Sequence, residues 1–143
     1  MTCICWDGTT LAADRYVWVN GAVALMTKIR RVGSSLIGVS GGANLAPQIF
    51  EWAKTDFAEN TIPALQKDPK DHATIMRITE DRQILMYENY YIPWINERKF
   101  WAIGLGREVA IGALAAGATS VEAVEIAEEY SGNTGKGIDY LTF

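Results

Sequence analysis

Hydrophobic and polar residues follow a strand-like pattern over the first third of the chain. An apolar, β-rich run over Thr2–Trp6 ends at an Asp-Gly pair, and a second extended run follows over Thr9–Val19. Asn20-Gly21 separates this run from Ala22–Leu25, and Asn-Gly between two such runs is the strongest short-range hairpin signal. We therefore predict a strand meander that continues to a further strand over Ser35–Ser40.

The pattern then changes to a helical period. Leu45, Ile49, Ala53 and Phe57 recur every four residues, which predicts an amphipathic helix. Asn44 is placed to cap it. The segment that follows, up to His72, is irregular.

The second half of the chain alternates between both kinds of element. Thr119 and Glu122 have the spacing of a capping box, and Gly132 suits a left-handed helix end. We predict an α+β fold in a single domain over residues 1–143, with helices covering sheets. The predicted elements are strands over Ala73–Thr79 and Gln83–Tyr87, a turn or pocket wall over Asn89–Trp94, a strand over Lys99–Ile103, helices over Arg107–Ala116 and Thr119–Tyr130, and a strand over Ile138–Phe143.

Composition narrows the classes of function. The formal net charge is −4 and no long run of Lys or Arg occurs, so we expect no nucleic-acid partner. No apolar run approaches the roughly 18–20 residues that span a bilayer, and the N-terminal segment lacks the basic start of a signal peptide. We therefore expect no membrane partner and a cytoplasmic protein.

The metal-ligating residue types are scarce. Cys3 and Cys5 are the two cysteines and His72 is the single histidine, too few for a Cys/His zinc site. We expect two small buried thiols, a histidine in a loop, no metal and no cofactor.

Four segments, in order, resemble the β-type proteasome subunits and the bacterial HslV peptidase. They are Met1-Thr2 opening into a strand, Thr10–Arg15 (TLAADR), Thr27–Val32 followed by Ile37–Gly42, and Trp101–Gly106 running into a small-residue helix and the helix that contains Glu122–Ala127. The resemblance spans almost the whole chain. It implies a four-layer αββα sandwich of the N-terminal-nucleophile (Ntn) hydrolase type, reduced in size because the chain is short for the family.

The resemblance also implies a catalytic site. Thr2 would be the nucleophile once Met1 is removed, with its own α-amine as the general base. Lys28 would supply a positive charge that lowers the pKa values of the hydroxyl and the amine, held by the Asp14 carboxylate. The backbone N–H of Gly41 would stabilise the oxyanion.

Taken one at a time, these residues have plainer interpretations. Asp14-Arg15 could be a surface ion pair of little energetic value. The cluster of Lys28, Arg30 and Arg31 could be a solvated basic face, and Gly41-Gly42 could be a turn.

The chain departs from the family in two places. Leu105 and Arg107 stand where the family has serines, one of which assists the nucleophile. Ser131 stands where the family has an Asp that closes the hydrogen-bond network of the amine. Thr134 and Gly135 match the Ser-Gly pair that follows that Asp. A serine can accept a hydrogen bond but brings no negative charge.

The resemblance implies a threonine-type endopeptidase that cleaves polypeptides through an acyl-enzyme. Such subunits assemble as homo-oligomeric rings, and an ATPase unfoldase is a possible partner. An alternative is a catalytically silent structural or assembly protein on the same fold, which the lost serines favour. A third is an Ntn amidase acting on a small non-peptide amide.

Overall fold

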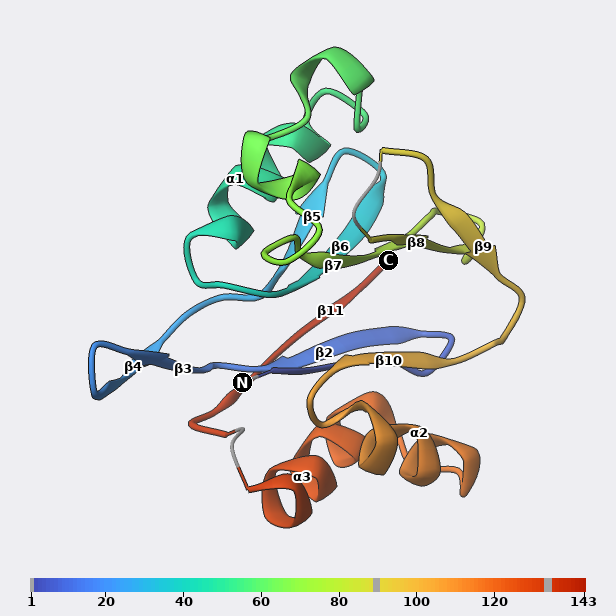
Figure 1. The fold of residues 1–143 in the computed structure, drawn as a ribbon. Helices are drawn as coiled ribbons and strands as arrows, with labels where there is room; N and C mark the ends of the chain where they lie inside the picture. The colour runs from blue at the N-terminus through green and yellow to red at the C-terminus, as the bar shows by residue number, and fades with distance from the viewer. Residues whose placement is uncertain (1, 89–90, 133–134) are drawn as a thin grey trace.

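Two β-sheets stack face to face with helices outside them (Figure 1). The structure is a computed structural model that describes residues 2–88, 91–132 and 135–143. Helix α1 (Leu45–Ala53) covers one sheet, and α2 (Arg107–Ala115) and α3 (Ser120–Ser131) cover the other. The order of layers is helix, sheet, sheet, helices, which is the predicted αββα sandwich.

The four-stranded sheet contains the N-terminal strand. All its neighbouring strands are antiparallel, in the spatial order β10 (Trp101–Gly104), β1 (Cys3–Trp6), β2 (Thr10–Asp14) and β11 (Ile138–Thr142). Side chains alternate across β1, so Ile4 and Trp6 face the other sheet while Cys3 and Cys5 face α2 and α3. The two thiols are fully buried and free, as predicted.

The five-stranded sheet is also antiparallel throughout. Its order is β5 (Ile29–Val32), β6 (Ser35–Ser40), β7 (Thr74–Ile78), β8 (Ile84–Tyr87) and β9 (Trp94–Asn96). We predicted a turn or pocket wall up to Trp94, but this residue begins the edge strand β9. The strand is only three residues long, and Trp94 and Ile95 are both exposed, so no alternating pattern marks it in the sequence.

A separate hairpin projects from the sandwich (Figure 1). The predicted single run over Thr9–Val19 is two strands, because the chain leaves the four-stranded sheet at Arg15 and continues as β3 (Tyr16–Val19). Among the strands of the described residues, β3 pairs only with β4 (Ala22–Leu25). The turn between them has φ values of +50° at Asn20 and +82° at Gly21, the positive values that the predicted Asn-Gly turn requires.

Helix α1 is shorter than the helix that the four-residue period up to Phe57 predicts. It ends at Ala53, and Asp56 and Phe57 have φ values of +55° and +57°, which no right-handed helix contains. Asn44 has helical rather than extended dihedrals, and its side chain makes no capping hydrogen bond, so the predicted cap is wrong. Two short 3₁₀ turns follow, η1 (Glu59–Thr61) and η2 (Ala64–Lys67).

Helix α3 begins and ends as predicted. Thr119 accepts a hydrogen bond from the Glu122 N–H, and the Glu122 side chain accepts one from the Thr119 N–H. Gly132 follows the helix with a φ of +77°. None of the helices in the described residues is long and apolar enough to cross a membrane.

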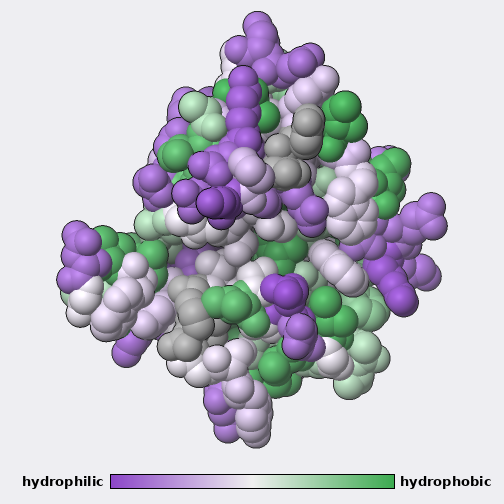
Figure 2. All heavy atoms as spheres, viewed as in Figure 1, coloured by the Kyte–Doolittle hydropathy of each residue, from purple (hydrophilic) through white to green (hydrophobic). Residues whose placement is uncertain are grey.

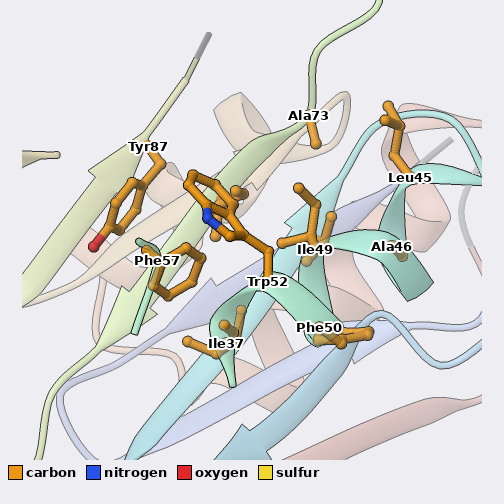
Figure 3. Packing of buried hydrophobic residues seen from close by; sticks show 12 residues of the cluster. Ile37, Leu45, Ala46, Ile49, Phe50, Trp52, Phe57, Ala73 and Tyr87 are labelled. Atoms are coloured by element: carbon orange, nitrogen blue, oxygen red, sulfur yellow. The ribbon is translucent and has the colours of Figure 1, made fainter. Parts of the chain in front are cut away.

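Three hydrophobic clusters hold the layers together. One lies between the two sheets and contains Ile4, Leu11 and Met76. One lies between the four-stranded sheet and the α2–α3 pair. The third lies under α1, where Trp52 and Tyr87 both pack against Phe57 at centroid distances of 4.9 and 4.4 Å (Figure 3).

Candidate active site

Thr2, Asp14 and Lys28 come together where three strand ends meet. Thr2 precedes β1, Asp14 ends the adjacent antiparallel strand β2, and Lys28 precedes β5 in the other sheet. The Lys28 carbonyl accepts a hydrogen bond from the Val39 N–H at 3.0 Å, which extends the pairing of β5 with β6 as far as Lys28. All three side chains are buried, with exposed fractions of 7% for Thr2, 0% for Asp14 and 1% for Lys28.

The Asp14 carboxylate connects Lys28 to the backbone beside Thr2. The Lys28 Nζ lies 3.0 Å from both carboxylate oxygens. The Cys3 N–H, which is the amide that follows Thr2, donates to Asp14 Oδ1 at 2.8 Å. Oδ2 accepts from the N–H groups of Tyr16 at 3.1 Å and Gly135 at 3.4 Å. An ion pair that is buried in this way and satisfied by backbone donors differs from a surface pair.

The buried position of Lys28 disfavours its charged form. Burial lowers the pKa of Lys28 from its ordinary value, although the charge and hydrogen bonds of Asp14 oppose this shift. Arg30 and Arg31 are exposed. The interpretation of this cluster as a solvated basic face is therefore correct for the two arginines and wrong for Lys28.

Two glycines hold the main chain of Thr2. The Gly106 N–H donates to the Thr2 carbonyl at 3.2 Å. Gly104 has a φ of +91°, and a β-carbon there would lie 2.1 Å from the Thr2 carbonyl oxygen, so no other residue fits. From the sequence we noted the missing serines of this segment but did not predict that its glycines pack against Thr2. The signal for this role was the Gly-X-Gly pattern at the end of a strand.

The residues at the two serine positions provide no hydroxyl near Thr2. The Leu105 side chain is 60% exposed. Arg107 is also exposed, and its Nη1 donates to the Gly104 carbonyl at 3.2 Å. The structure therefore places neither residue where it could replace a serine next to Thr2.

Gly41 follows β6, on the strand that pairs with the Lys28 segment. A β-carbon on Gly41 would lie 3.2 Å from the Ala73 Cα, so the backbone passes close to β7. A depression of about 450 Å³ opens beside Gly41 and reaches His72. His72 lies outside the helices and strands, as expected, with its Nδ1 3.3 Å from the Asp68 carbonyl oxygen.

The C-terminal residues of the expected network lie only partly within the described residues. Gly135 reaches Asp14 through its N–H. Ser131 lies at the end of α3, and its hydroxyl donates to the Ala127 carbonyl of the same helix. Thr134 and Met1 lie outside the described residues.

Glu128 is a partly buried acidic residue that sequence reasoning missed. It lies on α3 next to Gly135, with Oε1 buried and without a hydrogen-bond partner among the described residues. Burial, followed by the negative charges of Asp14 and Glu125, raises the pKa of its carboxyl. A signal was present, because Glu128 lies four residues after the buried Val124 and so shares its helix face.

The described residues contain no group of three or more His, Cys, Asp or Glu side chains that could hold a metal ion. The groups that the site does bring together are the Asp14–Lys28 pair and the backbone amides of Cys3 and Gly135, next to the main chain of Thr2.

Known proteins resemble this chain in structure and not detectably in sequence. The sequence matches no known protein-family profile and no curated protein. The fold is similar to BPH from Thiobacillus denitrificans, both in complex with epoxomicin (TM-score 0.73, 18% identity, 99% of this chain and 97% of that chain) and without it (TM-score 0.72, 18% identity, 99% and 96%). It is also similar to eukaryotic HslV from Trypanosoma brucei (TM-score 0.66, 20% identity, 98% and 97%). The chain thus has the α+β, Ntn-hydrolase-type fold of the HslV and proteasome-type peptidases.

Proposed function

We propose that this protein is a threonine-type peptidase in which Thr2, after removal of Met1, is the nucleophile. The observation that carries the proposal is the buried Asp14–Lys28 pair, hydrogen-bonded to the amide that follows Thr2. Burying two charges is costly, so a pair placed against the first residue of β1 calls for a function. The fold shared with HslV-type peptidases supports the same assignment.

The α-amine of Thr2 serves as the base. A free α-amine has a pKa near ~8, so part of it is neutral at physiological pH and can accept the hydroxyl proton, directly or through one water. The hydroxyl oxygen attacks the peptide carbonyl, and the amine returns the proton to the departing nitrogen. Water then cleaves the acyl-enzyme ester. While Met1 is attached, the Thr2 nitrogen is an amide and lacks this basicity.

Lys28 and Asp14 set the electrostatics of this step. A nearby ammonium favours the ionised hydroxyl and the neutral amine, and Lys28 is the proposed source of this charge. Asp14 fixes the direction of the Lys28 side chain through both carboxylate oxygens. The backbone N–H of Gly41 is the proposed oxyanion donor, and loss of one such donor typically slows acyl transfer by about 10²–10³.

The replacement of two family serines by Leu105 and Arg107 leads us to expect slow peptide hydrolysis. Leu105 is exposed and the Arg107 guanidinium binds a carbonyl, so no serine at these positions relays the proton near Thr2. We infer a slow peptidase that relies on the amine alone. An ATPase unfoldase would then deliver polypeptides to it.

We further propose a homo-oligomeric ring. The hairpin exposes Trp18, Val23 and Leu25, and hydrophobic residues are visible on this projection at the left of Figure 2. The β9 edge exposes Trp94 and Ile95 at the opposite end of the molecule (Figure 1). Two different apolar surfaces at opposite ends suit head-to-tail contact between copies, which closes into a ring when the rotation permits.

Intact-mass measurement with a peptide-turnover assay tests the proposed activity. We expect purified protein to lack Met1 and to hydrolyse fluorogenic peptides, and Thr2→Ala to abolish turnover while leaving the fold intact. Retention of Met1 in native protein, or turnover that survives Thr2→Ala, contradicts the proposal. Retained Met1 without turnover favours the silent assembly protein.

A further inference from the structure

Glu128 is an acidic side chain that lies partly buried against the protein interior. It is partly buried on α3, and its Oε1 has no hydrogen-bond partner among the described residues. A β-carbon on Gly135 would lie 3.7 Å from the Glu128 Cδ and 3.9 Å from both Oε atoms. The carboxylate therefore lies against the Gly135 backbone.

One route connects this carboxylate to Thr2 through Asp14. The Gly135 N–H donates to Asp14 Oδ2, while Asp14 Oδ1 accepts from the Cys3 N–H, the amide that follows Thr2. Glu128 thus lies against Gly135, which is itself hydrogen-bonded to Asp14 in the network that holds the start of β1.

A second route runs through the α3 backbone. A β-carbon on Gly106 would lie 3.2 Å from the Cβ of Ala127, the residue before Glu128. The Gly106 N–H in turn donates to the Thr2 carbonyl. The helix turn that carries Glu128 is therefore packed against the segment that binds Thr2.

The charges around Glu128 disfavour its ionised form. Asp14 on β2 and Glu125 on α3 are both negative, and they add to the effect of burial in raising the pKa of the carboxyl. Lys28, from the other sheet, binds both oxygens of Asp14. Because a buried carboxylate oxygen without a hydrogen-bond partner is costly, a cationic donor next to Oε1 would stabilise the site.

We infer that Glu128 is a positioning residue that accepts a hydrogen bond from the α-amine of Thr2. When the Thr2 hydroxyl attacks the substrate carbonyl, its proton moves to the amine, and Glu128 stabilises the ammonium until the proton passes to the leaving nitrogen. Lys28 lowers the pKa of the amine and Glu128 raises it, so that together they keep it near neutrality. This inference rests on the proposed function and supplies the negative charge that Ser131 cannot bring.

The test is a titration of the amine in protein that begins at Thr2, prepared by cleavage of an N-terminal ubiquitin fusion. The rate of acetylation of the terminal amine as a function of pH gives its pKa. We expect Glu128→Gln to lower this pKa by roughly one unit and to move the acid limb of the kcat/KM profile to lower pH by the same amount. Glu128→Asp, which keeps the charge, should restore most of the shift.

Glu129→Gln is the matched control, because it removes the same charge from an exposed neighbour on the same helix. Equal amine pKa values in the Glu128→Gln, Glu129→Gln and unmodified proteins would overturn the inference, and Glu128→Ala gives a second reading if the glutamine variant folds poorly. If the amine pKa shifts as expected but the unmodified protein cleaves no peptide, the proposed function fails and the positioning role stands. If peptides are cleaved and the pKa does not move, the inference alone fails.

Discussion

Gly104 lies so close to Thr2 that a β-carbon would fall 2.1 Å from the Thr2 carbonyl oxygen. The register of the sheet enforces this approach, because Gly104 pairs with Cys3 at the end of β10. Its φ of +91° also disfavours any residue with a side chain. The position of Thr2 therefore depends on a glycine that is distant from it in the sequence.

We predict that Gly104→Ala destabilises the fold severely, by about 3 kcal/mol or more, since a steric clash and backbone strain combine. Gly112→Ala is the control, because nothing lies within 4 Å of its added β-carbon. In the interior of α2 it should stabilise the protein by about 0.5–1 kcal/mol. Urea unfolding measures both changes, and equal stability of the two variants would refute the packing role.

Lys28→Met should be strongly destabilising, because it leaves the Asp14 charge buried without its cation. Removing one partner of a buried pair typically costs about 3–5 kcal/mol. Lys54→Met is the matched control: Lys54 pairs with Glu51 on the surface, where such pairs contribute less than about 1 kcal/mol.

The double change Asp14→Asn with Lys28→Met should recover part of this loss in urea unfolding, since no unpaired charge remains. If Lys28→Met unfolds at the same urea concentration as Lys54→Met, the pair is not buried in solution.

Asp7 provides a pH-dependent connection between β1 and α3. Burial on its own would raise the pKa of Asp7, but hydrogen bonds from the backbone N–H groups of Ser120, Thr10 and Thr9 outweigh it and leave the pKa below its ordinary value of 3.8. A depressed acid pKa contributes stability that is present above the unfolded-state value and is lost as the pH falls through the folded-state value.

We therefore expect Asp7→Asn to lower the free energy of unfolding by less than about 1 kcal/mol at pH 7, because solvent screens a carboxylate that is only partly buried. The difference between the variant and the unmodified protein should shrink as the pH falls below about 4. Urea unfolding at several pH values checks this. A difference that stays constant down to low pH would show that the ionised carboxylate is not the stabilising form.

Head-to-tail assembly through the hairpin and the β9 edge predicts a specific behaviour of variants at these two surfaces. If the proposed ring forms, Trp18→Glu on the hairpin and Trp94→Glu on β9 should each convert it to monomers in native mass spectrometry. Each variant keeps one intact surface, so mixing the two should produce dimers that contain one copy of each. Tyr130→Glu, at an exposed position on α3, should leave the ring intact.

A mixture of the two tryptophan variants that stays monomeric would contradict head-to-tail contact between these surfaces. So would dimers formed by either variant alone.

The sequence predicts the locally determined features best. The hairpin follows from the Asn20-Gly21 turn, and α3 follows from its Thr119–Glu122 capping box, because in both cases residues close in the chain decide the conformation. The four-layer order came from the family resemblance, which the structure confirms as a fold.

The missed features depend on contacts between distant residues. β9 forms only because β8 offers it an edge, and α1 stops before Phe57 because that ring packs back on Trp52 and Tyr87. The contact of Gly104 with Thr2 likewise joins residues that are distant in the chain. The local signals at Gly104 and Glu128 mark two packed positions but do not identify the residues that they contact.

Covalent labelling with epoxomicin is a direct test of Thr2 as the nucleophile. Protein that begins at Thr2 should gain the mass of one inhibitor, with tandem mass spectrometry placing the adduct on Thr2, whereas Thr2→Ala should gain nothing. Failure of the Thr2-initiated protein to label, or an adduct that persists in Thr2→Ala, would contradict an N-terminal threonine nucleophile.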